Sequence, residues 1–193
     1  MTLGEFFFKY RGITPLPLVL IIVYFARPTP QSFFLGLMGM LLGEAIRLWG
    51  VSYAGGATRT RQVGAPRLVT NGPFAYVRNP LYLGNMLIYT GAAIIPNVWT
   101  PWLLFIVWIY FGFQYYWIVR LEEQKLTELF GSTYRRYQQQ VPRFFPRFSP
   151  APPAHPVDPD LKAALKSEKS TFLSFLTILL LFYLKMRFVS YPR

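Results

Sequence analysis

The chain contains no cysteine and a single histidine among its 193 residues. Without cysteine it cannot form disulfides, thiolate zinc sites or iron–sulfur clusters, and it has no cysteine nucleophile. The histidine, His155, lies in a proline-rich stretch without metal-ligating neighbours, so we expect it to have no catalytic role. These absences predict a protein that works without a metal ion.

Charged residues are also few, because they make up 15% of the chain whereas hydrophobic residues make up 53%. Both values differ from those of ordinary soluble domains in the direction of a membrane protein. Acidic residues are the scarcer kind, with eight against twenty Lys and Arg and a formal net charge of +12. In so apolar a chain the basic excess favours anionic lipid headgroups as partners, and we expect no nucleic-acid partner.

Internal repeats and glycine-rich phosphate-binding patterns are absent from the sequence as well. No GxGxxG or Walker pattern follows a strand-like run, which excludes a Rossmann or P-loop domain. Aromatic residues, by contrast, make up 19% of the chain, which excludes disorder for most of it.

Long apolar segments dominate the sequence. A transmembrane helix needs about 20 apolar residues, or somewhat fewer where flanking Lys and Arg reach the interface. The qualifying segments are residues 13–26, 32–53, 81–95, 98–119 and 171–184. The last covers only about 21 Å and either spans or lies at the interface. We predict an all-α polytopic integral membrane protein with four to five transmembrane helices, the third and fourth joined by a two-residue turn at Pro96-Asn97.

Basic residues are concentrated in two of the connecting stretches. Arg59, Arg61, Arg67 and Arg78 precede the third apolar segment, and Arg120, Lys125, Arg135, Arg136, Arg143 and Arg147 follow the fourth. The positive-inside rule therefore places both stretches and the N-terminus in the cytoplasm. A fifth span puts Lys185, Arg187 and Arg193 on the outer side, against that rule.

Prolines divide the chain near its C-terminal end. Pro150, Pro152, Pro153, Pro156 and Pro159 predict that residues 149–160 form an extended linker. We therefore divide the chain into N-terminal membrane helices with a basic loop (1–67), a core (68–148), this linker (149–160) and a C-terminal membrane helix (161–193).

A first polar motif, residues 68–84, lies at the entry to the third apolar segment. Asn79 precedes a proline and is disfavoured in a helix, so a helix begins at or just after Pro80. The free N–H groups and the positive dipole end of that helix favour an anion. The alternative is an ordinary membrane-entry turn, in which Arg78 and two tyrosines anchor the interface.

A second polar motif begins with Arg120, Glu122 and Glu123 at the end of the fourth apolar segment and continues to Pro146. Adjacent helical residues point about 100° apart, so one Glu can pair with an arginine while the other faces a pocket. The alternative is a solvated helix end. A shared pocket is favoured, because the predicted topology brings both motifs to one membrane face.

The order and spacing of these motifs resemble the isoprenylcysteine carboxyl methyltransferase and phospholipid methyltransferase superfamily. The resemblance covers about residues 68–146 and rests on Gly72-Pro-Phe-x-Tyr76-x-Arg78-Asn79-Pro80-x-Tyr82-x-Gly84, Glu122-Glu123, Phe130-Gly-x-x-Tyr134-x-x-Tyr137 and Val141-Pro-x-Phe-x-Pro146. It implies an integral membrane enzyme that binds S-adenosylmethionine in a small cytosolic region built from the two motifs. The usual histidine of that superfamily is Asn79 here, which cannot carry a titratable proton, and this favours a positional role.

The resemblance also implies site residues and an acceptor. For catalysis it indicates Arg78, Glu122 and Glu123. For cofactor binding it indicates Tyr76, Asn79, Pro80, Tyr82, Gly84, Arg120, Glu122, Glu123, Tyr134 and Tyr137. The implied acceptor reaches the pocket from the bilayer and is an isoprenylcysteine carboxylate, a phospholipid amine or an isoprenoid-like lipid. Two alternatives stay open: an NADPH-dependent membrane sterol or isoprenoid reductase, and a non-catalytic lipid-binding protein.

Glu44 and Arg47 are ionisable residues inside the second apolar segment, where charge is costly and often marks a substrate path. Their spacing places them on one helical face. They form either a structural ion pair, with Arg47 reaching toward the interface, or a contact for the polar group of the acceptor.

Overall fold

The computed structural model describes residues 1–55, 64–154 and 156–188, and within these residues it is helical, with no strand. The helices are α1 (Leu3–Tyr10), α2 (Leu16–Phe25), α3 (Pro30–Ala54), α4 (Pro80–Ile94), α5 (Trp102–Gln140), α6 (Leu161–Ser167) and α7 (Lys169–Phe188), with a 3₁₀ turn, η2 (Gly72–Ala75), before α4. Each of the five predicted apolar segments contains a helix. The all-α prediction is confirmed.

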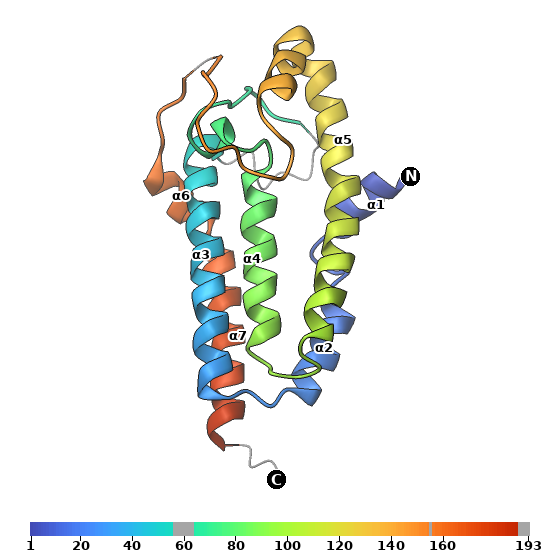
Figure 1. Ribbon diagram of the computed structural model, residues 1–193, viewed down its shortest axis with the longest axis vertical. Helices are drawn as coiled ribbons and strands as arrows, with labels where there is room; N and C mark the ends of the chain where they lie inside the picture. Colours follow the sequence, from blue (N-terminus) through green and yellow to red (C-terminus); the bar gives the residue numbers. More distant parts are fainter. Residues whose placement is uncertain (56–63, 155, 189–193) are drawn as a thin grey trace.

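Three of the described helices, α3, α5 and α7, are long and apolar enough to cross a membrane, and α2 is a shorter apolar helix. Figure 1 shows α3, α4, α5 and α7 running side by side along the long axis of the molecule. The helix at the last predicted segment extends beyond the apolar run 171–184 at both ends, which supports the spanning alternative. Helix α7 has 20 residues, which cover about 30 Å, the thickness of a hydrocarbon core.

The connection between α4 and α5 also differs from the prediction. It is not a two-residue turn, because α4 ends at Ile94 and α5 begins at Trp102. Thr100 precedes Pro101 and is thereby disfavoured in a helix, so α5 begins after that proline. Asn97 and Trp99 adopt positive φ values within this connection, of 49° and 52°.

Helices α3 and α4 pack closely through glycines. A Cβ on Gly43 of α3 would lie 2.5 Å from the carbonyl oxygen of Gly84, and one on Gly84 would lie 2.7 Å from that of Gly43. Gly36 and Gly91 face each other in the same way farther along the two helices. Small residues at such positions let membrane helices approach until their backbones touch. The pairing fixes α4, and with it Pro80 at its first turn.

Helix α5 continues well beyond its apolar part and turns at Gly131. This residue has φ 52° and ψ −122°, a conformation that a glycine adopts without strain. The turn carries Tyr134 and Tyr137 back over the segment that precedes α4, where both are buried. Both polar motifs consequently lie at one end of the bundle, the upper end in Figure 1, whereas α7 ends at the opposite end.

The proline-rich segment is extended, as predicted, but it packs against the core. Ala151 N–H donates to the Ala75 carbonyl at 2.9 Å, and Asp160 N–H donates to the Ser52 carbonyl at 2.8 Å. The Asn71 side chain donates to the Val157 carbonyl at 2.7 Å. The linker therefore covers the first motif and leads α6 and α7 back to α3.

Candidate functional site

The first motif is joined to the end of the second by backbone contacts. Helix α4 begins at Pro80, as predicted, and Asn79 just before it has φ −125° and ψ 57°. The Arg78 N–H donates to the Pro142 carbonyl at 2.9 Å, and the Asn79 amide donates to the Arg143 carbonyl at 3.1 Å. Asn79 thus performs a positional task that needs no titratable proton.

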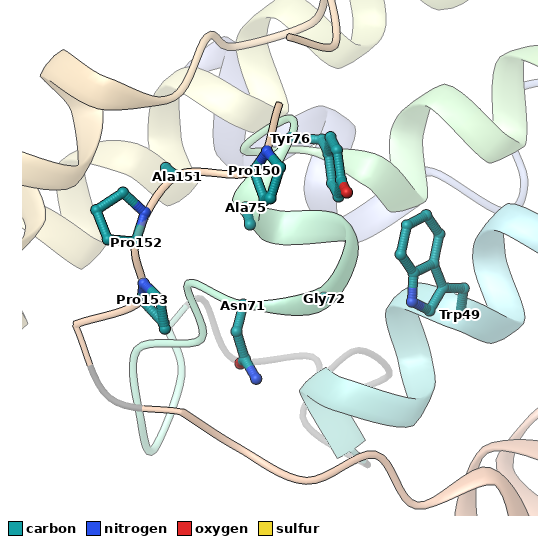
Figure 2. Close-up of a pocket in the computed structure, with 9 residues that line it drawn as sticks. All are labelled: Trp49, Asn71, Gly72, Ala75, Tyr76, Pro150, Ala151, Pro152 and Pro153. Carbon is teal, nitrogen blue, oxygen red and sulfur yellow. The ribbon is translucent and has the colours of Figure 1, made fainter. Parts of the chain in front are cut away.

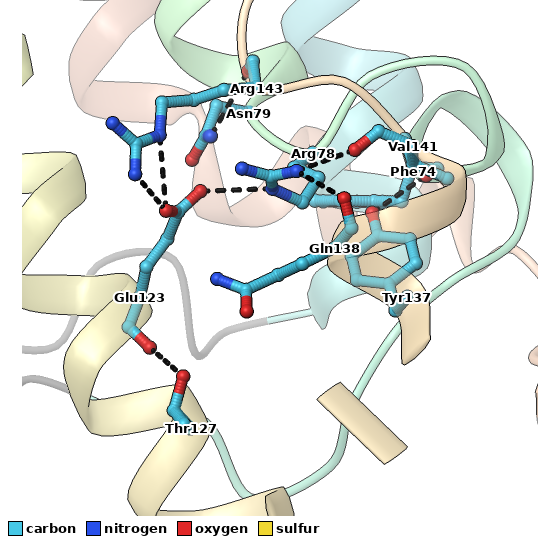
Figure 3. Close-up of polar contacts among 9 residues, drawn as sticks. All are labelled: Phe74, Arg78, Asn79, Glu123, Thr127, Tyr137, Gln138, Val141 and Arg143. Atoms are coloured by element: carbon cyan, nitrogen blue, oxygen red, sulfur yellow. Dashed lines mark hydrogen bonds and ion pairs between the residues drawn. The ribbon is translucent and has the colours of Figure 1, made fainter. Parts of the chain in front are cut away.

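Glu123 lies between two arginines, as Figure 3 shows. Its Oε1 accepts from Arg78 Nε and its Oε2 from Arg143 Nε, both at 3.0 Å. Arg78 also donates to the carbonyls of Gln138 and Val141, at 3.0 and 2.6 Å. Glu123 is only 4% exposed, and its hydrogen bonds raise the pKa of Arg143, which therefore stays charged.

Both carboxylate oxygens of Glu123 are consequently occupied by side chains of the protein. The predicted catalytic and cofactor roles of Glu123 and Arg78 stay predictions, while the contacts give both residues a positioning role. They hold α5, the start of α4 and the segment after α5 together. A buried charge with two partners keeps one arrangement, because loss of either partner leaves a charge unpaired.

Glu122 points elsewhere, which confirms that the two adjacent carboxylates diverge. Its Oε1 accepts a hydrogen bond from the Tyr82 hydroxyl at 2.8 Å. Its Oε2 accepts none from any residue that the structure describes. One Glu122 oxygen is therefore without a hydrogen-bond donor among the described residues, and its predicted contact with a cofactor stays a prediction.

Aromatic rings continue from Tyr82 into the bundle between α4 and α5. The ring centroids of Tyr82 and Tyr115 are 4.6 Å apart, and Tyr89 stacks on Phe111 at 3.8 Å. The Tyr115 hydroxyl donates to that of Tyr89 at 3.3 Å. This aromatic column, Tyr82, Tyr115, Tyr89 and Phe111, connects the Glu122 carboxylate with the apolar interior.

Arg11 is a basic residue near the two motifs whose position the sequence did not reveal. It follows α1 and interacts electrostatically with both Glu122 and Tyr82. Its guanidinium carbon lies 4.6 Å from the centroid of the Phe8 ring. In the sequence it is one basic residue beside an apolar segment, and nothing there links it to α5.

Tyr134 and Tyr137 form a small core together with Leu68, Val141 and Ala151. The Tyr137 hydroxyl donates to the Phe74 carbonyl at 2.7 Å, as Figure 3 shows. These two tyrosines thus hold the second motif on the first. Their predicted contact with a cofactor stays a prediction.

Comparison with known proteins identifies the family of this arrangement. The sequence model of the phospholipid methyltransferase family matches residues 31–133, more than half of the chain. The chain belongs to the phospholipid methyltransferase family. The matched residues include α3, α4 and α5 as far as Thr133, and thus Arg78, Glu122 and Glu123.

Individual relatives of this family member carry several names. The cobalt-zinc-cadmium resistance protein CzcN of Cupriavidus metallidurans is 29% identical over 121 residues, 63% of this chain and 52% of the relative. The protein-S-isoprenylcysteine O-methyltransferase of Schizosaccharomyces pombe is 33% identical over 81 residues, 41% of this chain and 33% of the relative. Methanethiol S-methyltransferase 1 of Bradyrhizobium diazoefficiens is 32% identical over 90 residues, 45% and 28% of the two chains.

The chain thus spans about half or less of the length of these curated relatives. No solved structure matches it.

Three other predicted cofactor residues of this family member contact residues other than Glu122. The ring centroids of Tyr76 and Trp49 are 6.0 Å apart. Both residues line a separate pocket, shown in Figure 2, together with Asn71, Gly72, Ala75 and residues 150–153. Gly84 packs against α3, where a Cβ would meet Arg47 Cγ at 2.7 Å.

Arg120 is exposed, and its guanidinium carbon lies 5.6 Å from the Trp117 ring centroid. Arg120 lines an open pocket with Glu123, Gln124, Thr127, Glu128, Gln138 and Arg143.

Arg47 is the centre of a second buried polar cluster. Its Nε lies 3.4 Å from Glu44 Oε2, which confirms the structural ion pair. Its Nη2 also donates to both oxygens of Glu168, at 3.0 and 2.9 Å, and its Nη1 donates to Asn85 at 2.6 Å. Glu168 is completely buried and lies outside the family match. A substrate role for Glu44 and Arg47 stays a prediction.

His155, Arg59, Arg61 and Arg193 fall outside the described residues, so the expectations for them have no structural counterpart.

Proposed function

We propose that this protein transfers a methyl group from S-adenosylmethionine to a lipophilic acceptor at the end of the bundle that carries both motifs. The observation that supports it most is the match to the phospholipid methyltransferase family over residues 31–133, a range that includes Tyr82, Glu122 and Glu123. The geometry supports it, because the two motifs meet around a buried ion-pair network.

The residues at Glu122 fit the chemistry of this cofactor. The open Glu122 oxygen can accept hydrogen bonds from ribose hydroxyls or an amino group, and a charged hydrogen bond is stronger than a neutral one. The Tyr82 ring beside it offers an aromatic face of the kind that attracts cations. Arg120, at the rim of the open pocket, is the candidate partner for a cofactor carboxylate.

The reaction needs alignment more than a protein nucleophile. When bound, the cofactor supplies an activated methyl group on a cationic sulfur. The protein supplies position, because Arg78, Glu123 and Arg143 hold the elements around the site in one arrangement. Glu122 supplies a negative charge that favours binding of the cationic cofactor. No Ser-His or Cys-His pair is required.

The acceptor is proposed to be lipophilic because the aromatic column runs from Glu122 into the apolar interior. The names of two relatives, which refer to an isoprenylcysteine and to methanethiol, support transfer to an acceptor that is not a large polar molecule. We propose that the motif-bearing end faces the cytoplasm and contacts anionic lipid headgroups, because the described parts of the two basic stretches, with Arg67, Arg78, Arg135, Arg136, Arg143 and Arg147, belong to the segments at that end.

The decisive experiment is isothermal titration of the purified protein in detergent with S-adenosylhomocysteine and, separately, with NADPH. We expect binding of the sulfur compound and none of NADPH. Transfer of a labelled methyl group from S-adenosylmethionine into a lipid extract then separates an enzyme from a lipid-binding protein. Binding of NADPH alone would identify a reductase, and binding of neither compound would contradict the methyltransferase function.

A further inference from the structure

The chain that follows α5 turns two phenylalanines outward. Phe145 is 86% exposed and Phe148 is completely exposed. Both belong to a short stretch, residues 143–148, that we call the phenylalanine loop. Single exposed apolar side chains are common on proteins, but two exposed aromatic rings on one short loop indicate an apolar surface outside the chain.

Hydrogen bonds to neighbouring segments fix the phenylalanine loop. The Arg147 N–H donates to the Tyr76 carbonyl at 3.0 Å, and Arg147 Nη1 donates to the Gln140 carbonyl at 2.9 Å. Just before the loop, the Pro142 carbonyl accepts from the Arg78 N–H at 2.9 Å. The backbone is thus held on both sides of Phe145, and the outward position of the two rings is part of the fold.

The phenylalanine loop lies at the level where the bilayer should end. At a rise of about 1.5 Å per residue, Trp49 lies about 28 Å from Pro30, the first residue of α3, which is close to the thickness of a hydrocarbon core. Trp49 is 45% exposed, and tryptophan is enriched at this boundary. Its ring lies 6.0 Å from that of Tyr76, to which the loop is bonded. In Figure 1 the chain after α5 returns to the start of α4.

An uncharged surface connects the loop with α3. The pocket of about 510 Å³ in Figure 2 is lined by Trp49, Tyr76 and the proline-rich residues 150–153, and none of its lining residues is charged. Leu42 precedes Trp49 by two helical turns on the same face of α3 and is 57% exposed. Because α3 is long and apolar enough to span, this face contacts lipid, and the surface beside the loop continues it.

We propose that Phe145 and Phe148 insert into the lipid leaflet beside the site, with Arg147 between them at the level of the headgroup phosphates. Aromatic rings gain free energy by leaving water, whereas a guanidinium at this level reaches the phosphates and stays hydrated. The inference does not depend on which reaction the site performs.

Insertion would anchor the end of the second motif from two sides. Arg143, at the start of the phenylalanine loop, binds Glu123 of α5 through Nε at 3.0 Å, and Phe145 two residues later enters the leaflet. The buried ion-pair network is thereby held at the membrane surface.

The test measures the depth of nitroxide labels on single introduced cysteines, because the chain has no native cysteine. Ser149→Cys places a label on an exposed residue next to Phe148 and leaves both phenylalanines in place. Ile109→Cys, at a position 72% exposed on the apolar part of α5, is the reference for lipid. Ser132→Cys, at an exposed position after the turn at Gly131, is the reference for water.

The full chain is studied in nanodiscs of zwitterionic and anionic phospholipids. Collisions of each label are measured with molecular oxygen, which concentrates in the bilayer, and with a neutral nickel chelate, which stays in water. We expect the Ser149 label to favour oxygen, as the Ile109 label does, and the Ser132 label to favour nickel. Replacing both phenylalanines, Phe145→Ser with Phe148→Ser, should shift the Ser149 label toward the Ser132 values.

Leu129→Ser is the matched control, because it also removes an exposed apolar side chain, 51% exposed, but from α5. It should leave the depth of the Ser149 label unchanged. Three results would overturn the inference: a Ser149 label as accessible to nickel as the Ser132 label, a depth that persists without the phenylalanines, or shielding from both reagents, which would indicate a covering protein such as a second copy. The first and third need no phenylalanine variant to fold. No methyl donor is present, so failure of the proposed methyl transfer would be a separate result.

Discussion

Glu122 and Glu123 are neighbours on α5, yet the first accepts a hydrogen bond from Tyr82 at 2.8 Å and the second bridges Arg78 and Arg143 at 3.0 Å. The difference follows from helical geometry, because consecutive side chains point about 100° apart. Glu123 is buried with both oxygens paired, whereas Glu122 keeps one oxygen open. One substitution made at each position should therefore have different consequences.

Glu123→Gln should lower the free energy of unfolding, and Glu122→Gln should lower ligand affinity. Breaking a fully buried ion pair costs about 3 to 5 kcal/mol, and we expect about 2 kcal/mol or more because Arg143 is partly exposed. Glu122→Gln should change stability by less than about 1 kcal/mol and weaken S-adenosylhomocysteine binding by about 10-fold to 150-fold. Denaturant unfolding in detergent and isothermal titration measure the two effects.

Glu128→Gln provides the control for the stability measurement. Glu128 pairs with Lys125 at 2.9 Å on the surface, where its side chain is 66% exposed. Such a pair contributes about 0 to 1 kcal/mol, so stability should stay nearly unchanged. Equal losses of stability at Glu122 and Glu123 would show that the two carboxylates have the same role and contradict the assignment.

Local signals in the sequence predicted the features that depend on neighbouring residues. Pro80 marks the start of α4 because a proline is favoured in the first turn of a helix. The apolar runs predict five helices because the bilayer requires them. The divergence of Glu122 and Glu123 follows from helical geometry alone. These predictions needed no knowledge of which helix packs against which.

Features that depend on tertiary packing were not predicted. Arg11 and Glu168 lie far in sequence from Glu122 and Arg47, and only the docking of α1 and α7 brings them there. The extent of α5 was also missed, because hydropathy falls after Val119 although the helix continues to Gln140. Tyr76 and Gly84 belong to the recognised motif, but the backbone directs them toward α3 instead of Glu122.

Gly43→Ala and Gly84→Ala should each destabilise the protein by about 1 to 3 kcal/mol, the usual effect of overpacking. The added methyl group would lie 2.5 or 2.7 Å from a backbone carbonyl oxygen, which cannot move aside as a flexible side chain can. Thermal unfolding in detergent, followed by circular dichroism, measures the change.

Gly112→Ala is the matched control, since Gly112 is also helical but a Cβ there would meet nothing within 4 Å. It should leave stability unchanged or raise it slightly, because alanine favours a helix by up to about 1 kcal/mol over glycine. A similar loss at all three positions would indicate a general effect of the substitution and would contradict the packing of α3 on α4.

Arg47 and Glu168 should show energetic coupling in a double-mutant cycle. Each single change, Arg47→Gln or Glu168→Gln, removes one charge from a buried pair with contacts of 3.0 and 2.9 Å. The double variant should lose less stability than the sum of the two, by about 0.5 to 3 kcal/mol, as contacting residues do. Additive losses would show that the contact between α3 and Glu168, at the junction of α6 and α7, contributes little to stability.

The side of the membrane that each end faces can be tested with single cysteines, because the chain has no native cysteine. Ser132→Cys lies at the motif-bearing end and should react with a membrane-impermeant thiol reagent only from the cytoplasmic side. Asn97→Cys and Phe188→Cys should react from the opposite side, because the α4–α5 connection and the end of α7 lie at the other end of the bundle.

Phe188 is the sharper test, since Lys185 and Arg187 in the last turn of α7 favour the cytoplasm by charge. Cytoplasmic labelling at Phe188 with outside labelling at Asn97 would show that α7 does not cross the membrane, and outside labelling at Ser132 would separate the site from cytosolic S-adenosylmethionine.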